Sequence, residues 1–232
     1  VIRAQGAEAA KFLHGQLTQD VLTLGRSQAR LAGYCSPKGR LLASFLMWMP
    51  ADDEVLLACH ASVLATTLKR LSMFVMRAPC RLSDASAEVV LTGVTGEPAR
   101  NATAGLATWG KRDTTEGCWI CLPEISGVAR AWHITTPSAH AGAIALQALA
   151  LWHQLEIDSG IVTIEAATVD RFVPQMLNHE LIGAVNFQKG CYPGQEVVAR
   201  SQYRGTTKRR TFLYACDAAL AAGQEVFHSS DP

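Results

Sequence analysis

The residues best suited to thiol chemistry lie in segment 188–200, which reads Gln-Lys-Gly-Cys-Tyr-Pro-Gly-Gln-Glu-Val-Val-Ala-Arg. Good helix formers and apolar residues at helical spacing follow Pro193, so we expect a helix to begin just after Cys191. The free amide groups and positive dipole end of that helix, together with Lys189, favour a thiolate at Cys191. Cys191 is therefore a candidate reactive or ligand-contacting thiol. The alternative is a small buried hydrophobe, which is what most free cysteines are.

The same segment resembles a family signature. The string Lys-Gly-Cys-Tyr-x-Gly-Gln-Glu-x-x-x-Arg is similar to that of the YgfZ family, folate-binding proteins related to the glycine cleavage T-protein and linked to iron–sulfur protein maturation. Other stretches that look like the family are residues 12–21, 35–40, 172–178, 183, 186–187, 203–205 and 208–210. Residues 51–150 carry no motif that we recognise. The resemblance therefore covers both ends of the chain and leaves its middle unmatched.

The composition predicts a folded chain in a reducing compartment. Of the 232 residues, 49% are hydrophobic, which is enough to bury a substantial core. The net charge of +1 gives no overall attraction to nucleic acid or to an anionic membrane. The seven cysteines are odd in number and scattered, so we expect free thiols and a cytoplasmic location. We find neither a signal peptide nor an apolar run long enough to span a membrane, and we expect no direct membrane contact.

Hydrophobic spacing predicts alternating strands and helices in the first half of the chain. The expected elements are a helix over 7–17, strands over 31–35, 41–49 and 54–59, a helix over 62–77, and strands over 80–82 and 88–94. The turn Ser36–Gly39 should join the first two strands into a hairpin. The later strand–strand–helix–strand order is typical of a split βαβ layer that resembles ferredoxin-like folds.

Cys118 and Cys121 have the CxxC spacing of a redox motif or of half a zinc site. A redox motif begins a helix, however, and a zinc site needs a second ligand pair, and neither follows here. We therefore expect this pair on a buried strand and predict no metal site. Further expected elements are a strand over 129–135, a short β-branched segment at 162–164, a strand that starts at 211–216, and a long helix over 138–156 that Ser138 caps after Pro137.

Together with the resemblance, these elements imply an α+β class with the folate-binding fold of the YgfZ and T-proteins. We expect mixed sheets and a ferredoxin-like split βαβ layer. Residues 1–48 and 151–207 should form a discontinuous folate-binding subdomain around an inserted subdomain at 49–150. Residues 208–232 should be the start of a C-terminal β-barrel that is largely missing.

The resemblance also implies a tetrahydrofolate site. Such a site needs a carboxylate for the pterin edge, an aromatic or apolar slot for the rings, and cations for the tail. Segment 155–161 looks like the T-protein segment whose carboxylate holds the pterin, which gives that role to Asp158; the alternative is a turn carboxylate at a helix end. The other candidate folate contacts are Asn186, Lys189, Gln195, Arg200 and Tyr203, and the candidate catalytic residues are Cys191 and Lys189. For Arg200, a solvent-facing side chain or a pair with Glu196 is the ordinary alternative.

The function implied by the resemblance is that of a tetrahydrofolate-binding accessory factor. It would serve iron–sulfur client enzymes, including those that thiolate tRNA, with Cys191 as its characteristic thiol. Two alternatives stay open: a folate-dependent aminomethyl (one-carbon) transferase, and a cysteine-based redox protein on the same scaffold. Whether the chain is itself an enzyme is open for the same reason. The basic run formed by Tyr203, Arg204, Lys208, Arg209 and Arg210 is typical of a solvated face, and we expect no direct nucleic-acid partner.

Overall fold

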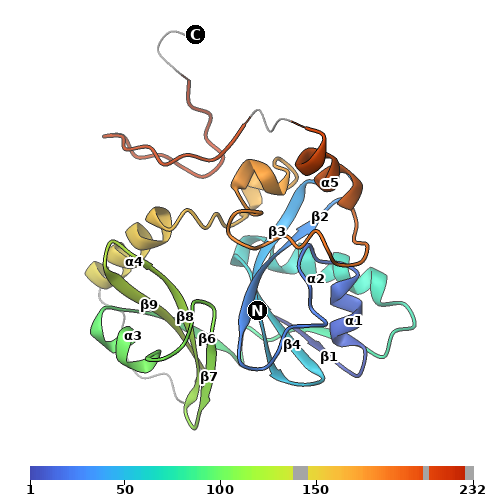
Figure 1. Ribbon diagram of the computed structural model, residues 1–232, viewed down its shortest axis with the longest axis horizontal. Coiled ribbons are helices and arrows are strands. Elements are labelled where there is room, and N and C mark those ends of the chain that lie inside the picture. Colours follow the sequence, from blue (N-terminus) through green and yellow to red (C-terminus); the bar gives the residue numbers. More distant parts are fainter. Residues whose placement is uncertain (138–145, 206–208, 228–232) are drawn as a thin grey trace.

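Two β-sheets packed face to face form the centre of the protein (Figure 1). The computed structural model describes residues 1–137, 146–205 and 209–227. The strands are β1 (Ile2–Gln5), β2 (Ala29–Cys35), β3 (Leu41–Ala51), β4 (Glu54–Ala58), β5 (Arg81–Asp84), β6 (Val90–Thr95), β7 (Lys111–Thr114), β8 (Gly117–Ile125) and β9 (Val128–Thr135). The helices are α1 (Ala9–His14), α2 (Ala61–Val75), α3 (Glu97–Ala102), α4 (Leu146–Asp158) and α5 (Gln195–Tyr203), with short 3-10 turns at Ala166–Thr168 and Pro174–Leu177. The predicted α+β class is confirmed.

The first sheet has the strand order β2-β3-β4-β1-β5 and the second β6-β9-β8-β7. The predicted split βαβ unit is β4-α2-β5, because β1 lies between β4 and β5 and pairs antiparallel with both. Adjacent strands in the described part of the chain pair antiparallel, where mixed sheets are expected from the sequence. Hairpins make most of these connections, and a hairpin can join only antiparallel strands.

Helices α1 and α2 cover the outer face of the first sheet. In α2, Val63, Thr67 and Leu71 recur at four-residue spacing and are buried, as an amphipathic helix requires. They pack with Leu13 of α1 against alternate residues of the strands, such as Phe45 of β3. Among the residues that the structure describes, this cluster is the largest apolar core.

The inner face of the first sheet packs against the second sheet. Leu46, Trp48 and Leu56 from the first sheet meet Ile120 and Leu122 of β8. Both faces of β3 are therefore covered, which explains why its residues 45–49 are buried without alternation. On the far face of the second sheet lies α3, so the order of layers is helices, sheet, sheet, helix (Figure 1).

The predicted β2–β3 hairpin is confirmed, and α5 packs against its turn. The two strands pair from Ala29 with Trp48 to Cys35 with Leu41. Gly39 in the turn has a φ of +70°, and a Cβ there would lie 2.7 Å from the Cβ of Val197 on α5. Glycine at this position therefore permits both the turn and the close approach of the helix.

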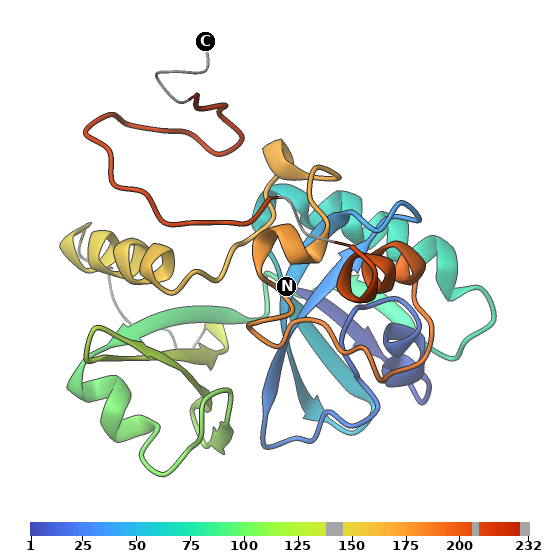
Figure 2. The same ribbon diagram turned by 45° about the horizontal axis from the view of Figure 1, so that its top comes forward.

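Helix α4 lies beside the second sheet, and α5 lies at the end of the hairpin (Figure 2). Trp152 of α4 covers Gly93 of β6, where a Cβ would come within 2.5 Å of the indole ring. Residues 209–227 extend away from both sheets in the same view. Many of their apolar side chains are exposed, including those of Phe212, Tyr214 and Phe227.

Several predicted elements differ from the observed ones. Residues 211–216 do not form a strand, because their β-branched and aromatic residues find no strand to pair with. The short strands β1 and β7 are absent from the sequence prediction. The predicted subdomain boundary between residues 48 and 49 falls inside β3. This strand pairs with β4, which lies wholly within the predicted inserted subdomain. The predicted cap Ser138 and the first residues of its helix lie outside the described residues.

Candidate functional site

A cavity of about 370 Å³ between the two sheets is the candidate binding site. Strands β2, β3 and β4 form one wall and β6, β8 and β9 the other, while α4 and segments 161–163 and 179–184 enclose it further. Most of the lining is apolar. Volumes of about 300–1,000 Å³ with few polar groups are typical of small-molecule sites.

A charged pair lies in the cavity wall, formed by Arg130 of β9 and Glu156 of α4. Arg130 is only 1% exposed, and its Nη2 donates to Oε1 of Glu156. Its Nε and Nη1 have no hydrogen-bond partner in the described part of the chain. Burial raises the pKa of the Glu156 carboxyl, and the charge of Arg130 counteracts that rise. The pair therefore offers a ligand a carboxylate acceptor next to unused guanidinium donors.

His179 is a second polar group at the cavity. It is 2% exposed, and its Nε2 lies 3.4 Å from the carbonyl oxygen of Val162. Its Nδ1 has no partner among the residues described. Burial lowers the pKa of His179 to about 4, so the imidazole is neutral near pH 7. A neutral imidazole can donate a hydrogen bond from one nitrogen and accept one at the other.

Aromatic side chains give the cavity a flat surface. Trp109 and Trp132 line it, and Trp132 packs against Trp152 of α4 with ring centres 4.5 Å apart and planes tilted by 58°. The guanidinium carbon of Arg130 lies 5.2 Å from the centre of the Trp152 ring. A planar heteroaromatic ligand could stack here while its polar edge meets the charged pair.

The predicted site residues lie elsewhere. The segment that leads into α5 carries Asn186, Lys189 and Cys191, and α5 begins with Gln195. None of these four residues lines the cavity. The side chain of Asn186 accepts from the backbone amide of Gln188 at 2.8 Å, as in a local turn. The predicted helix after Pro193 is present as α5, with Gly194 as its N-cap.

Lys189 is buried rather than free to meet a ligand tail. Its Nζ donates to the backbone oxygen of Leu17 at 2.8 Å and to that of His14, at the C-terminal end of α1. Burial lowers its pKa to about 8, although the charges of Asp20 and Cys191 act in the opposite direction. Lys189 therefore ties the segment to α1, and its charge interacts with the neighbouring Cys191.

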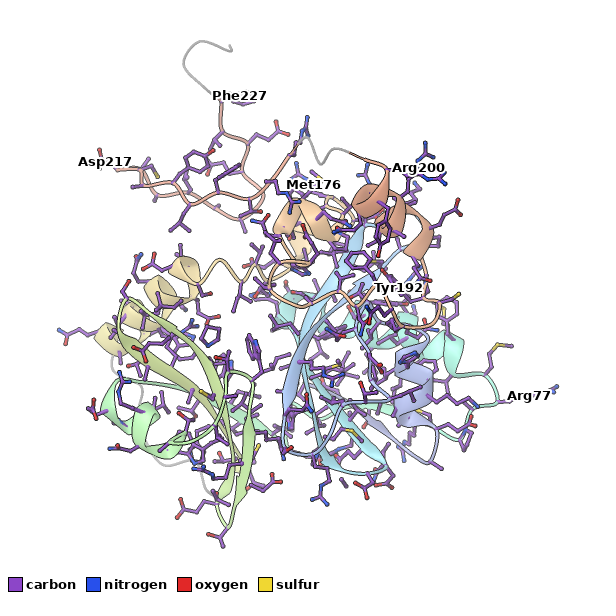
Figure 3. The ribbon with its side chains drawn as sticks, in the orientation of Figure 1. Arg77, Met176, Tyr192, Arg200, Asp217 and Phe227 are labelled. Carbon is purple, nitrogen blue, oxygen red and sulfur yellow. The ribbon has the colours of Figure 1, made fainter. Side chains whose placement is uncertain are left out.

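Cys191 is a free and exposed thiol, which excludes the alternative of a small buried hydrophobe. The next residue, Tyr192, is buried, so these two neighbouring side chains lie on opposite sides of the chain. Arg200 and Tyr203 on α5 face outward, and Arg200 stands at the rim of the molecule in Figure 3. The rings of Tyr203 and Phe187 pack in a T-shaped arrangement, with ring centres 5.8 Å apart.

Asp158 is the last residue of α4 and is exposed. Its Oδ1 accepts from Nε2 of Gln154 one helical turn earlier, at 2.9 Å. The carboxylate that lines the cavity instead belongs to Glu156, two residues before it. Two positions along a helix change the direction of a side chain by about 200°, which accounts for the difference.

One cation of the basic run at 203–210, Arg210, binds to other parts of the chain. Arg210 donates to the backbone oxygen of Gln175 and to Oδ1 of Asn178, both at 3.1 Å, and it pairs with Glu180. This cation therefore fixes the chain after α5 to the 3-10 turn at Pro174–Leu177, and is not part of a solvated face. Lys208 lies outside the described residues.

Metal and membrane sites are not evident in the described ranges. No three His, Cys, Asp or Glu side chains gather there in a way that could hold a metal ion. Cys118 and Cys121 lie on β8 as predicted, and side chains three apart on a strand point to opposite faces. None of the helices in this part of the chain is both long and apolar enough to cross a membrane.

The cavity residues Arg130, Glu156 and His179 are missing from the sequence-based site. One available signal is that Arg130 stands as a single charge in the otherwise uncharged strand Val128–Thr135. Glu156 lies inside the segment compared with the T-proteins, two residues before Asp158, the residue chosen from it. For His179 we find no signal in the sequence.

The chain resembles curated proteins over most of its length, although no family model matches it. The tRNA-modifying protein YgfZ of Shigella boydii serotype 4 (strain Sb227) is 32% identical over 226 residues, which cover 92% of this chain and 68% of the relative. The protein of the same name from Escherichia coli (strain K12 / DH10B) is 31% identical, with the same coverage of both chains.

A solved structure shares the fold. The aminomethyltransferase T of the glycine cleavage system from Bartonella henselae superposes with a TM-score of 0.61 at 16% identity. The match covers 87% of this chain and 60% of that structure. The T-protein-like fold expected from the sequence is thereby confirmed.

Proposed function

Because the chain belongs to the family of tRNA-modifying proteins named YgfZ, we propose that it binds a tetrahydrofolate between its two sheets and supports tRNA modification. The observation that carries this proposal is the cavity itself. It combines aromatic walls with the Arg130–Glu156 pair inside a fold shared with an aminomethyltransferase.

The chemistry of a folate matches this lining. A pterin is a flat ring system whose 2-amino and ring N–H groups donate along one edge, next to a carbonyl that accepts. Glu156 can accept from the donating edge, and the unused N–H groups of Arg130 can meet the carbonyl. Trp109 and Trp132 supply surfaces against which the rings can stack.

Two carboxylates on α4 are candidates for binding the pterin edge. Asp158 is the candidate by resemblance, and Glu156 is the candidate by position, because only Glu156 lines the cavity. We assign the pterin edge to Glu156. Asn186, Gln195, Arg200 and Tyr203 then belong to a separate surface near α5, where they could meet the tail of the folate or a partner protein.

Calorimetry of tetrahydrofolate binding tests this assignment. Glu156→Gln, which keeps the shape but loses the charge, should weaken binding tenfold to a hundredfold, or about 1.4–2.8 kcal/mol. Asp158→Asn is the matched control and should bind like the wild type. The reverse ranking would return the pterin to Asp158, and no binding by the folded wild type would refute the folate proposal.

Cys191 is proposed as the functional thiol of the protein, acting on iron–sulfur clients such as tRNA-thiolating enzymes. Its exposure supports this role, because a client must be able to reach the sulfur. Cys191→Ala should leave folding and tetrahydrofolate affinity nearly unchanged while abolishing support of tRNA thiolation in cells. A variant that fails to fold would instead make Cys191 a structural residue.

A further inference from the structure

His179 is a buried polar residue of the cavity wall that the folate assignment leaves unused. It is 2% exposed, and among the described residues that line the cavity only Arg130 is a polar residue buried as deeply. A buried polar atom without a partner costs free energy, so the unused atoms of these two side chains limit which ligands fit. The unused atoms of Arg130 are donors, and His179 contributes the opposite capacity.

The backbone fixes the position of His179. Its amide donates to the backbone oxygen of Pro174 at 3.1 Å, and its carbonyl oxygen accepts from the amide of Ala184 at 2.8 Å. The next residue, Glu180, is buried and pairs with Arg210. His179 is therefore anchored in the wall on both sides.

The hydrogen bond to Val162 determines which ring nitrogen of His179 carries the proton. A carbonyl oxygen can only accept, so Nε2 is the donor in this 3.4 Å contact. The amide of Ile164 donates to Oγ of Ser44 on β3 at 2.9 Å, which holds the segment of Val162 against the first sheet. The imidazole is neutral near pH 7, so a proton on Nε2 leaves Nδ1 as an acceptor. This Nδ1 has no partner in the described part of the chain.

Reduced and oxidised pterins offer different groups to such an acceptor. Tetrahydrofolate carries N–H groups at N5 and N8 of its reduced ring. Folic acid has the same two nitrogens without protons, and each presents a lone pair. A lone pair facing Nδ1 of His179 would leave two buried acceptors without a donor, whereas an N–H group satisfies both atoms.

We infer that His179 makes the cavity selective for the reduced pterin, because its Nδ1 accepts a hydrogen bond from an N–H group that tetrahydrofolate has and folic acid lacks. This inference rests on the proposed folate site and adds His179 to its ligand contacts. Glu156 and Arg130 are assigned to the amino edge and the carbonyl, which both forms of the pterin share. Those two residues therefore do not distinguish the forms, and the distinction depends on His179.

Anaerobic calorimetry with tetrahydrofolate and with folic acid tests this inference in the wild type and three variants. His179→Leu removes the acceptor. His179→Asn places an amide near the position of Nδ1, where its oxygen can accept or its nitrogen can donate. Leu181→Asn is the control on the same segment, because Leu181 is 72% exposed and does not line the cavity. Thermal unfolding shows whether each variant is folded.

The wild type and Leu181→Asn should bind tetrahydrofolate about tenfold to a hundredfold more tightly than folic acid. His179→Leu should lose most of this ratio because it weakens tetrahydrofolate binding, since the reduced ring then has a buried donor without a partner. His179→Asn should lose the ratio in the opposite way, with folic acid bound about tenfold more tightly and tetrahydrofolate little changed.

A wild type that binds both folates equally would overturn the inference and leave the folate site standing. The same conclusion would follow if the folded His179 variants kept the wild-type ratio, even with both ligands weakened. His179→Asn carries the test if His179→Leu does not fold. A wild type that binds neither folate would refute the folate proposal itself, and this inference with it.

Discussion

Replacing Lys189 with methionine should change how stability depends on pH. Lys189 donates two hydrogen bonds to backbone oxygens while buried at the end of α1. Burial lowers its pKa from the ordinary 10.5 to about 8. Between these values the unfolded chain holds a proton that the folded chain releases, so the free energy of unfolding rises with pH. The rise is about 1.4 kcal/mol per pH unit, or roughly 3 kcal/mol across the window.

Other groups act in the opposite direction over the same range. Burial raises the pKa of Cys35 to about 12 and that of Cys59 to about 11, so their contribution to stability is lost as pH rises. Because wild type and variant share these thiols, the difference between the two proteins isolates Lys189. Methionine keeps most of the side-chain volume, so the comparison does not add a large cavity.

Urea unfolding at pH 8, 9 and 10 measures this difference. The free energy of unfolding of the wild type minus that of Lys189→Met should grow by about 2–3 kcal/mol from pH 8 to pH 10. Lys11→Met is the matched control, since Lys11 lies on the exposed side of α1 and makes only a surface pair with Glu8. A difference that stays constant with pH would show that the lysine is not buried against α1 and would refute this description of the segment.

Two further predictions concern the surroundings of the site. Gly194→Ala should destabilise the protein by about 3 kcal/mol or more in thermal unfolding, because Gly194 has a φ of +79° and a Cβ there would lie 2.3 Å from the backbone oxygen of Ser36. Gly160 also has a positive φ, +66°, but a Cβ there would meet open space. Gly160→Ala should therefore cost only about 1–2 kcal/mol in the same assay. Equal losses would contradict the close packing of this segment on the hairpin. For His179, burial lowers the pKa from 6.5 to about 4, so the wild type should lose roughly 3 kcal/mol of stability as pH falls through that range. His179→Gln should lack this loss in urea unfolding, and an unchanged acid dependence would mean that His179 is accessible to protons.

Local sequence patterns predict most of the fold. The leucine spacing of α2 and the Pro–Gly turn of the β2–β3 hairpin need no distant contacts to be recognised, and both are observed. Strand β1 has only four residues and relies on β4 and β5 for its pairing, so its short alternation of buried and exposed residues is a weak signal. Segment 211–216 is the converse case, with strand-like residues and no strand partner.

The site is less predictable because its parts come from different layers. Arg130 and Glu156 stand 26 residues apart and meet only once α4 packs beside the second sheet. The family signature identifies Cys191 and Lys189, yet it does not reveal that Lys189 is turned inward or that His14 approaches from α1. Such pairings depend on tertiary structure, which no local spacing encodes.

A crystal structure of the chain with tetrahydrofolate would show directly whether the cavity between the sheets holds a folate. We expect the pterin ring in the cavity beside Trp109 and Trp132, with its amino edge within hydrogen-bond distance of Glu156. A pterin bound at segment 186–195 near Cys191, or a folate-saturated crystal with an empty cavity, would contradict it.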